Sequence, residues 1–396
     1  MSWSTSNFYF GDLIGEGFFG KVYHAKHKQK EGEGLPHSLP TNGVAIKTMD
    51  KTQIVKNGNT KMVLRERNTL AKLSHFESRR TVQLFMSFVD DQNLYLVLEL
   101  CEFGTLSALR REKKLSMEAI RNFSGQILSA VEFMHYHSVV HCDLKPDNVM
   151  IAHNFQIKIG DFGCAMDVSL GDCSEIDFVG TSDYVSPEVI KGSTGTFCES
   201  EDDKGAVEIT LNLKKPLPVF QLEHAFAIDL WAFGCLLYFI LEGVSPFHDR
   251  SDELALRRII QYVKRDEKIC LEYFKRTRSL EGSGDMAMST TSSKSSSMFE
   301  DGNKCLLDLV NHLLIADPPK RLGMGKVKPK HNNTYTSIRS HNFYLGFDWC
   351  QIDKEEEFDE HHRNMFQTLL SSPSIRTDVK QEEMQDGACL PFDFFA

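Results

Sequence analysis

The chain has 396 residues, 41% of them hydrophobic and 25% charged, which suits a globular protein large enough for two domains with sizeable cores. Its net charge of −10 argues against nucleic acid or an anionic membrane surface as the main partner. The ten cysteines form no CxxC pair, so neither a zinc site nor a disulfide framework is suggested. Free thiols in a reducing compartment, the cytoplasm, are the expectation.

The first hundred residues predict a small β-rich lobe. Short apolar runs alternate with glycines and turns, which indicates five antiparallel strands in NFYFGDLIGEG, GKVYHAK, GVAIKTM, RTVQLFMSFV and NLYLVLEL. One helix, over residues 60–73, is predicted to interrupt the strands. We assign residues 8–99 to this lobe and treat residues 1–7 as an N-terminal segment.

Helical periodicity dominates from residue 116 onward. The segment SMEAIRNFSGQILSAVEFMHYH places apolar residues on one helix face, namely Ile120, Phe123, Ile127, Val131 and Met134. Two short strands are predicted around NVMIA and QIKIG. The fold class is therefore α+β, with a small antiparallel β-rich lobe that carries one key helix and a larger α-rich lobe over residues 104–352.

The longest apolar run, residues 230–241, lies between Asp229 and Glu242. It is shorter than the roughly 20 residues that a membrane span needs. We therefore predict a helix buried on all sides and no transmembrane segment. The N-terminus MSWSTSNFYF also lacks the basic and apolar regions of a secretory signal.

Three stretches interrupt the pattern as linkers or insertions: residues 28–43, 193–221 and 278–304. The third is rich in Ser and Thr and has little apolar surface, so it is predicted to be disordered. Residues 353–396 form an acidic tail that ends in the aromatic cluster PFDFFA.

The segment GEGFFGKV, residues 15–22, fits the pattern G-x-G-x-x-G-x-V between two predicted strands. Glycines let backbone N–H groups lie over phosphates without Cβ collisions. A Rossmann turn would open a helix, whereas KVYHAKHK is typical of a strand, which favours a strand–loop–strand nucleotide site. The predicted phosphate-loop residues are Ile14, Gly15, Glu16, Gly17, Phe18, Phe19, Gly20, Lys21 and Val22.

VAIK ends in Lys47, and a Lys at the end of an apolar strand usually extends to solvent. The next helix favours another interpretation. Glu66 falls on the same stripe as Met62, Leu70 and Leu73, and a buried carboxylate needs a cation. We predict that Lys47 pairs with Glu66 and so reaches the α- and β-phosphates of a nucleotide.

HCDLKPDN, residues 141–148, is followed by DFG, residues 161–163. Asn148 and Asp161 offer hard oxygen ligands for Mg²⁺. Asp143 can accept the proton of an incoming hydroxyl, and Lys145 can neutralise the γ-phosphate of ATP. The order and spacing of these residues make coincidence negligible.

With these motifs the chain resembles a eukaryotic protein kinase over about residues 8–352, most closely the AGC group and its 3-phosphoinositide-dependent kinases. The resemblance rests on the glycine loop, VAIK, HCDLKPDN, DFG, FVGTSDYVSPEVI, DDQNLYLVLEL and RERNTL. It implies a bilobal protein kinase fold. It also implies an activation segment that carries Asp177 and Thr181 and ends in Glu188, which is expected to pair with Arg321.

The resemblance implies transfer of the γ-phosphate of ATP, with Mg²⁺, to Ser or Thr of protein substrates such as the activation loops of other AGC kinases. Lys145 in KPDN marks the Ser/Thr type. The alternative is a pseudokinase scaffold, which the intact set of Lys47, Asp143, Asn148 and Asp161 argues against. Adenine is expected between Val22 and Ala45 on one side and Met150 on the other, beside Leu98 and the backbone of Glu99 and Cys101.

Two positions depart from the resemblance. The family has a phosphorylated Ser where this chain has Asp177, and an Arg that receives the phosphate where it has Cys142. Phosphate and receptor are absent together, so loop phosphorylation at this position cannot be the switch. Cys142 either fills space beside His141 or senses redox state, and the charge of Asp143 disfavours its thiolate.

The resemblance also implies a docking pocket for FxxF motifs, at Lys51, Ile54, Val55, Val63, Arg67 and Leu94. A family Gln is replaced by Val89. The chain has its own FxxF, at Phe392 and Phe395, which is expected to occupy the pocket in cis unless PFDFFA is only a frayed end. Some forty residues after the kinase domain cannot form the pleckstrin-homology domain of the similar kinases, so membrane recruitment by that route is not supported.

Overall fold

The computed structural model describes residues 3–17, 20–28, 39–76, 80–152, 155–170, 181–194, 224–271, 297–324, 335–354, 362–365 and 368. The chain divides into two compact units. The first contains Met1–Thr105, Met150–Gly163 and Glu357–Ala396, and the second contains Leu106–Val149 and Cys164–Glu356.

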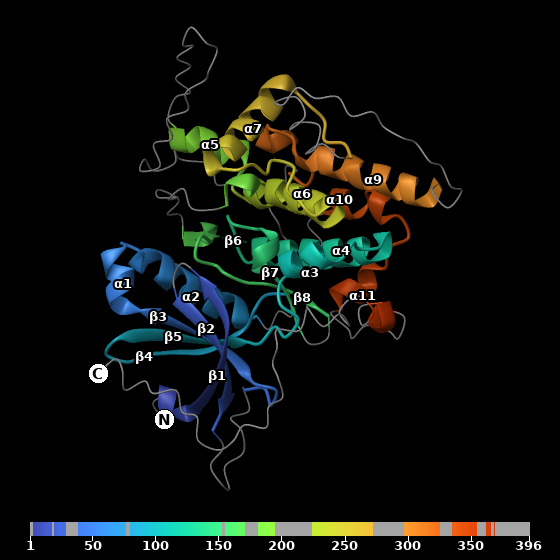
Figure 1. Cartoon of the computed structure of the whole chain (residues 1–396). Helices are drawn as coiled ribbons and strands as arrows, with labels where there is room; N and C mark the ends of the chain where they lie inside the picture. Colours follow the sequence, from blue (N-terminus) through green and yellow to red (C-terminus); the bar gives the residue numbers. More distant parts are fainter. Residues whose placement is uncertain are drawn as a thin grey trace. The chain divides into compact units, whose positions relative to one another are not determined.

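A five-stranded antiparallel sheet forms the body of the first unit (Figure 1). The spatial order of its strands is β1-β2-β3-β5-β4. The strands are β1 (Phe8–Gly17), β2 (Gly20–His27), β3 (Val44–Asp50), β4 (Leu84–Val89) and β5 (Asn93–Glu99). The prediction of five antiparallel strands in this lobe is thus confirmed.

One face of this sheet carries a buried apolar cluster. Phe8, Val44, Ile46, Tyr95 and Val97 are buried together there. The alternation of Val44 and Ile46 along β3 puts both on the same side, as the two-residue period of a strand requires. Leu39 is buried in the same cluster, so the end of the predicted linker 28–43 is part of the core.

Two helices lie between β3 and β4, where one was predicted. α2 (Thr60–Ser74) matches the predicted helix, and α1 (Lys51–Lys56) precedes it. The Asp50 side chain caps α1 by accepting a hydrogen bond from the Gln53 N–H at 2.8 Å. Six residues show too little of the helical period to be recognised in the sequence, but a side-chain cap stabilises such a short helix.

The second unit is mainly helical (Figure 1). Its long helices are α4 (Met117–Tyr136), α6 (Phe226–Glu242), α7 (Asp252–Arg265) and α9 (Ser297–Leu313). The shorter ones are α3 (Leu106–Glu112), α5 (Pro187–Thr194), α10 (Thr336–Arg339) and α11 (Trp349–Asp353). All five residues predicted for the apolar face of α4 are buried, as expected.

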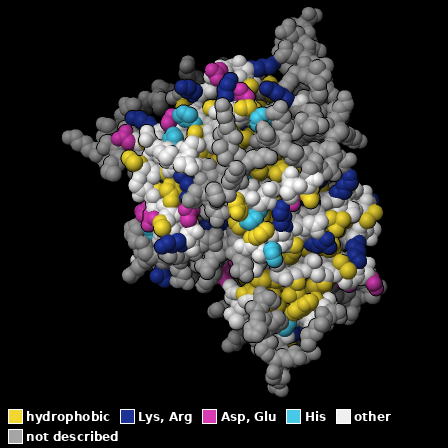
Figure 2. All heavy atoms as spheres, turned by 180° about the vertical axis from the view of Figure 1, so that it is seen from behind, with side chains coloured by type: hydrophobic (Ala, Val, Ile, Leu, Met, Phe, Trp, Pro, Cys, Tyr) yellow, Lys and Arg dark blue, Asp and Glu magenta, His cyan; other side chains and the backbone are white. Residues whose placement is uncertain are grey.

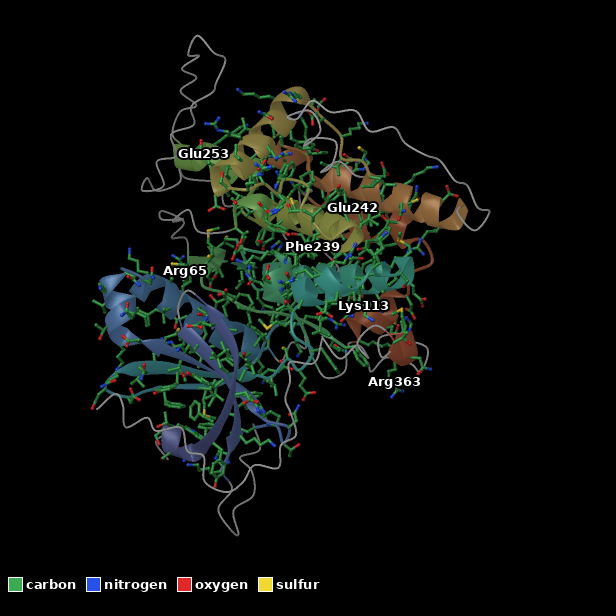
Figure 3. The ribbon with its side chains drawn as sticks, viewed as in Figure 1. Arg65, Lys113, Phe239, Glu242, Glu253 and Arg363 are labelled. Carbon is green, nitrogen blue, oxygen red and sulfur yellow. The ribbon has the colours of Figure 1, made fainter. Side chains whose placement is uncertain are left out.

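Helix α6 is the centre of this unit, and every residue from Ala227 to Ile240 is buried. This confirms a helix buried on all sides. Its C-terminus is capped by Arg110 of α3, which donates to the carbonyls of Ile240 (2.8 Å) and Leu241 (2.7 Å). Figure 3 marks this end of α6 with Phe239 and Glu242. Among the described residues, no helix is long and apolar enough to cross a membrane.

Four short strands place the loops that carry the chemical motifs. β6 (Val139–Val140) pairs with β9 (Met166–Asp167), and β7 (Val149–Ile151) pairs with β8 (Ile157–Ile159). The pair β7–β8 corresponds to the strands predicted in NVMIA and QIKIG. HCDLKPDN joins β6 to β7, and DFG joins β8 to β9.

The prediction of disorder over residues 278–304 is wrong for its last eight residues. α9 begins at Ser297, and its Gly302 is buried against Met117 of α4. Composition averaged over the whole segment did not reveal this start of α9. Burial against α4 stabilises these helical turns, whereas their own polar residues do not. α5 likewise runs to Thr194, into the predicted insertion 193–221. The remaining residues of both segments lie outside the described part of the chain.

Candidate active site

Lys47 on β3 and Glu66 on α2 form the predicted ion pair. The Lys47 Nζ lies 2.6 Å from Glu66 Oε1 and 2.8 Å from Oε2. The side chains are 13% and 3% exposed, so solvent screens the pair little. Burial opposes the charge of Lys47, but the carboxylates of Glu66 and Asp161 outweigh it and raise the pKa of the ammonium. Lys47 is therefore a fixed cation at neutral pH.

The burial of Glu66 follows from its place on α2. Met62, Leu70 and Leu73 are buried on the same helix, as the apolar stripe predicted. A carboxylate in that stripe is costly to bury unless a cation meets it. β3 brings Lys47 to that position, so the sequence pattern and the contact agree.

The glycine loop joins β1 to β2 as a hairpin, with Gly15 opposite Val22 and Gly17 opposite Gly20. Since a strand follows the loop, the Rossmann alternative is excluded. Gly20 has φ of +157°, and a Cβ there would lie 2.1 Å from the Thr48 carbonyl oxygen, so only glycine fits. Phe18 and Phe19 lie outside the described residues. Ile14, Glu16 and Lys21 belong to the two strands.

The residues expected around adenine lie on neighbouring strands of the same unit. Val22 pairs with Lys47 across β2 and β3, and Ala45 pairs with Leu98 across β3 and β5. Met150 packs its side chain against Gly160. Val22, Ala45 and Leu98 thus lie on adjoining strands of the five-stranded sheet, and Met150 lies on β7, which pairs with β8.

The side chain of Glu99, at the end of β5, is held by Lys158 of β8 at 2.8 Å. The sequence did not indicate this ion pair, because a partner almost sixty residues away leaves no local pattern. Burial, reinforced by the nearby Glu99 carboxylate, raises the pKa of the Cys101 thiol to about 12. Cys101 therefore stays protonated and offers its backbone rather than a thiolate.

Asp143 is the centre of the catalytic loop, and its carboxylate is held from three sides. Its Oδ1 accepts from the Thr181 N–H at 3.0 Å. Its Oδ2 accepts from Lys145 Nζ at 2.7 Å and from Asn148 Nδ2 at 3.2 Å. Lys145 also donates to the Thr181 hydroxyl at 2.8 Å. The three predicted residues of the motif and Thr181 are thus brought together.

The backbone of this loop is fixed by Asp229, a buried residue of α6. Its carboxylate accepts from the N–H groups of His141 (2.7 Å) and Cys142 (2.9 Å) and lies 2.8 Å from His135 Nε2. Cys142 adopts a left-handed φ of +63°, which this anchoring stabilises. His135 was not identified from the sequence, where it is one polar residue on a long helix.

The environment of Asp229 keeps it charged. Burial raises the pKa of its carboxyl, but the hydrogen bond and charge of His135, together with His141, outweigh burial and hold the pKa below its ordinary value. A fixed anion therefore sits beneath the catalytic loop at neutral pH.

Both predicted magnesium ligands offer suitable oxygens. Asn148 donates through its Nδ2 to the Asp143 carbonyl at 2.8 Å, a bond that does not use its amide oxygen. Asp161 adopts a left-handed φ of +61° directly before the buried Phe162. Mg²⁺ prefers a carboxylate and an amide oxygen as ligands, so the donor set fits this ion. Asp161 lies in the first unit and Asn148 in the second.

The end of the activation segment is held as predicted. Arg321 meets Glu188 through two bonds, Nη1 to Oε1 at 2.6 Å and Nη2 to Oε2 at 2.9 Å. Arg321 is 1% exposed and also lies 5.2 Å from the ring centroid of Trp231. This forked pair fixes the N-terminus of α5 in the helical unit. Asp177 lies outside the described residues.

Cys142 packs against an apolar cluster formed by Val140, Val189, Ala225 and Ile228. Its thiol lies 3.7 Å from the Val140 carbonyl oxygen. This packing agrees with the interpretation that Cys142 fills space where the family has an arginine. A redox role stays untested.

The predicted docking positions differ in exposure. Ile54 and Val63 are buried, Leu94 is half-buried, and Val55 is 70% exposed. Val89, at the end of β4, is 60% exposed. Lys51 donates to the Asp90 carbonyl, and Arg67 donates to Asn68 at 2.6 Å. Figure 2 shows one face of the whole molecule, on which hydrophobic side chains lie among Lys, Arg, Asp, Glu and His. Phe392 and Phe395 lie outside the described residues.

Comparison with known proteins agrees with this geometry. Residues 8–203 match the protein kinase domain family. This match supports the resemblance to protein kinases found in the sequence. The antiparallel sheet and helical unit described above are the α+β, bilobal fold of that family, and the expected fold class is confirmed.

The curated relatives indicate the subfamily. The chain is 29% identical to 3-phosphoinositide-dependent protein kinase 1 of Arabidopsis thaliana over 89% of its own length and 57% of that protein. It is 27% identical to the human protein of the same name, over 88% and 49%. It is 32% identical to the serine/threonine-protein kinase ppk21 of Schizosaccharomyces pombe, over 65% and 41%.

The chain thus spans about half the length of the curated relatives it matches. The expected resemblance to 3-phosphoinositide-dependent kinases of the AGC group is confirmed.

Proposed function

We propose that this chain is a Ser/Thr protein kinase that transfers the γ-phosphate of ATP to hydroxyl groups of protein substrates. The observation that carries the proposal is the arrangement around Asp143, whose carboxylate is held by Lys145, Asn148 and the Thr181 N–H. A carboxylate oriented in this way can accept a proton from a Ser or Thr hydroxyl. The enzyme class that fits is the non-specific serine/threonine protein kinases.

Each of the other site residues has a part in this reaction. Lys47, fixed by Glu66, neutralises the α- and β-phosphates of ATP. Asp143 takes the hydroxyl proton as the oxygen bonds to the γ-phosphorus, the bond from that phosphorus to the bridging oxygen of the β-phosphate breaks to release ADP, and Lys145 offsets the charge on the γ-phosphate oxygens. Asn148 and Asp161 would hold Mg²⁺, which when bound neutralises the phosphate charge.

The runner-up function is a pseudokinase scaffold that binds nucleotide without transferring phosphate. Full-length protein incubated with labelled ATP, Mg²⁺ and a basic peptide separates the two. We expect phosphopeptide from the native chain and none above background from Asp143→Asn. Nucleotide binding without transfer in the native chain would favour the scaffold.

We further propose that substrates include AGC kinases that carry a hydrophobic FxxF motif, in the cytoplasm. Supporting this are the exposed side chains of Val55 on α1 and Val89 at the end of β4, and Lys51, which lies four residues before Val55 and donates to the carbonyl of Asp90 beside Val89. We propose that the chain's own Phe392 and Phe395 compete for that surface in cis, because a tethered motif has a high effective concentration. An FxxF motif bound beside α2 would stabilise the ion pair between Glu66 and Lys47.

Deleting residues 391–396 tests the tail. We expect lower activity toward a short peptide and recovery when a free FxxF peptide is added. The Val55→Asp variant should abolish that recovery without changing the basal activity of the truncated enzyme. A truncated enzyme that keeps full activity and ignores the peptide would reduce PFDFFA to a frayed end.

A further inference from the structure

Two histidines and an aspartate meet on the helical unit, far in sequence from every motif used above. Asp308 and His312 are one turn apart on α9, and His341 precedes the short helix Asn342–Tyr344. His341 Nε2 lies 3.1 Å from Asp308 Oδ2, and His312 Nδ1 lies 3.6 Å from Asp308 Oδ1. Among the described residues, this is the group of three potential ligands whose donor atoms all lie within 4.8 Å of one another.

The spacing suits a small transition metal. In a tetrahedral zinc site with ligand bonds of about 2.0–2.1 Å, neighbouring ligand atoms lie roughly 3.3–3.4 Å apart. The two measured separations lie on either side of that value. One carboxylate and two imidazoles are also the ligand types that Zn²⁺, Co²⁺ and Ni²⁺ accept, whereas Mg²⁺ prefers oxygen ligands alone.

The local hydrogen bonds determine what a metal must displace. His312 Nδ1 lies 2.8 Å from the Asp308 carbonyl oxygen and donates to it, so a metal bound at Nδ1 must displace this hydrogen bond and leave the ring proton on Nε2. His341 Nδ1 accepts from the Phe343 N–H at 3.2 Å, so its Nε2 carries the proton that faces Asp308. A metal bound at His341 Nε2 replaces that proton. The 3.1 Å hydrogen bond between Nε2 and Asp308 is then lost.

The group is open on one side. Asp308 and His312 are 56% and 50% exposed, whereas His341 is 11% exposed. A metal can therefore enter from solvent and keep water in its remaining position. The buried ring of His341 supplies the rigid ligand, and the two residues on α9 are able to adjust their rotamers to it.

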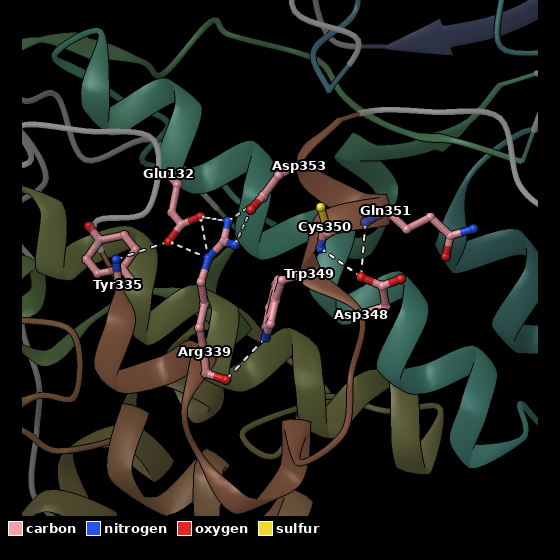
Figure 4. Close-up of polar contacts among 8 residues, drawn as sticks. All are labelled: Glu132, Tyr335, Arg339, Asp348, Trp349, Cys350, Gln351 and Asp353. Atoms are coloured by element: carbon pink, nitrogen blue, oxygen red, sulfur yellow. Dashed lines mark hydrogen bonds and ion pairs between the residues drawn. The ribbon is translucent and has the colours of Figure 1, made fainter.

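We propose that Asp308, His312 and His341 form a binding site for a zinc-like divalent transition metal, which clamps α9 to the segment Thr336–Tyr344. Arg339 already ties this segment to other helices (Figure 4). Arg339 donates to Glu132 of α4 and to Asp353 of α11, and the Trp349 indole donates to the Arg339 carbonyl. Those contacts tie the segment to α4 and α11, and the metal would tie it to α9.

Full-length protein, stripped with a chelator and dialysed, tests the site by titration with Co²⁺ and then Zn²⁺. We expect one Co²⁺ per chain with visible d–d bands and no thiolate charge-transfer band, since the ligands are nitrogen and oxygen. Zn²⁺ should displace it and raise the thermal unfolding midpoint, as a ligand of the folded state does. Mg²⁺ should do neither.

The variants His312→Ala and Asp308→Asn should each weaken Zn²⁺ binding at least about tenfold. Loss of a metal ligand lowers the affinity at least as much as loss of a group that hydrogen-bonds to a ligand. His75→Ala, which removes an exposed histidine on the other unit, is the control and should leave Zn²⁺ affinity unchanged. Both ligand variants change exposed side chains, so they should fold. His341→Ala is avoided because His341 caps a helix.

A thiolate band, or Zn²⁺ affinity unchanged in both ligand variants, would overturn the proposal, since the metal would then be on cysteines or elsewhere. No Co²⁺ or Zn²⁺ binding at micromolar concentrations would overturn it too. Kinase activity is not needed as a readout, so the test stands apart from the proposed function.

Discussion

The two units hold their functional side chains in different ways. In the first, Lys47 forms an ion pair with Glu66, which joins strand β3 to helix α2. In the second, Asp143 is held by Lys145, Asn148 and Thr181, and its loop is anchored on Asp229. The Lys47–Glu66 pair depends on where α2 lies on the sheet, whereas the bonds around Asp143 join the side chains of the catalytic loop to Thr181 and its backbone to α6. A shift of α2 is therefore expected to alter the Lys47–Glu66 pair and to leave the bonds around Asp143 unchanged.

The largest expected effect is on Asp143, because it would touch the reacting hydroxyl. Asp143→Asn keeps the size of the side chain but removes its proton acceptor. We expect phosphate transfer to fall by about 10²–10⁴-fold, the usual contribution of a general base. A single-turnover assay measures this, and ATP affinity measured alongside should stay within about twofold of the native value. A loss below tenfold would show that Asp143 only positions the substrate.

Asp229 tests whether the catalytic loop depends on one buried anion. Asp229→Ala leaves His135 and two backbone N–H groups without their acceptor, so we expect a loss of about 3–5 kcal/mol in the free energy of unfolding. Urea unfolding measures it. Asp229→Asn, which keeps one acceptor oxygen, should lose less. Equal stability of the native and Ala chains would contradict the anchoring role.

The pH dependence of stability gives a second measurement on Asp229. Its folded-state pKa lies below the ordinary value of 3.8. The carboxylate therefore contributes its full stabilisation above about pH 3.8 and loses it as the pH falls through the folded-state pKa. The difference in unfolding free energy between the native chain and Asp229→Asn should be constant from neutral pH to about pH 5 and shrink below about pH 3.8. A difference that grew on acidification would contradict the sign.

Glu66→Gln tests the ion pair of the first unit. The amide keeps a hydrogen bond to Lys47 but loses the charge, so Lys47 should be less well placed. We expect phosphate transfer to fall about tenfold, or roughly 1.4 kcal/mol in the activation free energy. In Lys47→Met, Glu66→Gln should have no further effect, since contacting residues are coupled. Additive losses in the double variant would mean that Glu66 acts by another route.

The smallest expected effect concerns Asp177 and Cys142. With its usual arginine partner replaced by Cys142, Asp177→Ala should lower activity less than about tenfold. In the Cys142→Arg background the same substitution should cost more, because the restored guanidinium gives the carboxylate a partner. Additive effects of Asp177→Ala and Cys142→Arg on activity would contradict the proposed coupling between these two positions.

Much of the fold could be predicted from the sequence because it is encoded locally. The strands follow the two-residue period, α4 follows the helical period, and α6 is apolar on every face. The catalytic motifs also depend on short spacings, which is why Asp143, Lys145 and Asn148 were identified and were found together. Glu66 could be matched to Lys47 because an acid in an apolar stripe requires a cation.

Other features were decided only by tertiary structure. α1 and the first turns of α9 lack a local signal, since a cap and burial against α4 stabilise them. The anchoring of the catalytic loop on Asp229 and His135, the ion pair of Glu99 with Lys158, and the approach of His341 to α9 all join residues far apart in the chain. Hydrophobic period is a property of neighbours in sequence, whereas a buried polar contact depends on which distant group the packing brings within hydrogen-bonding distance.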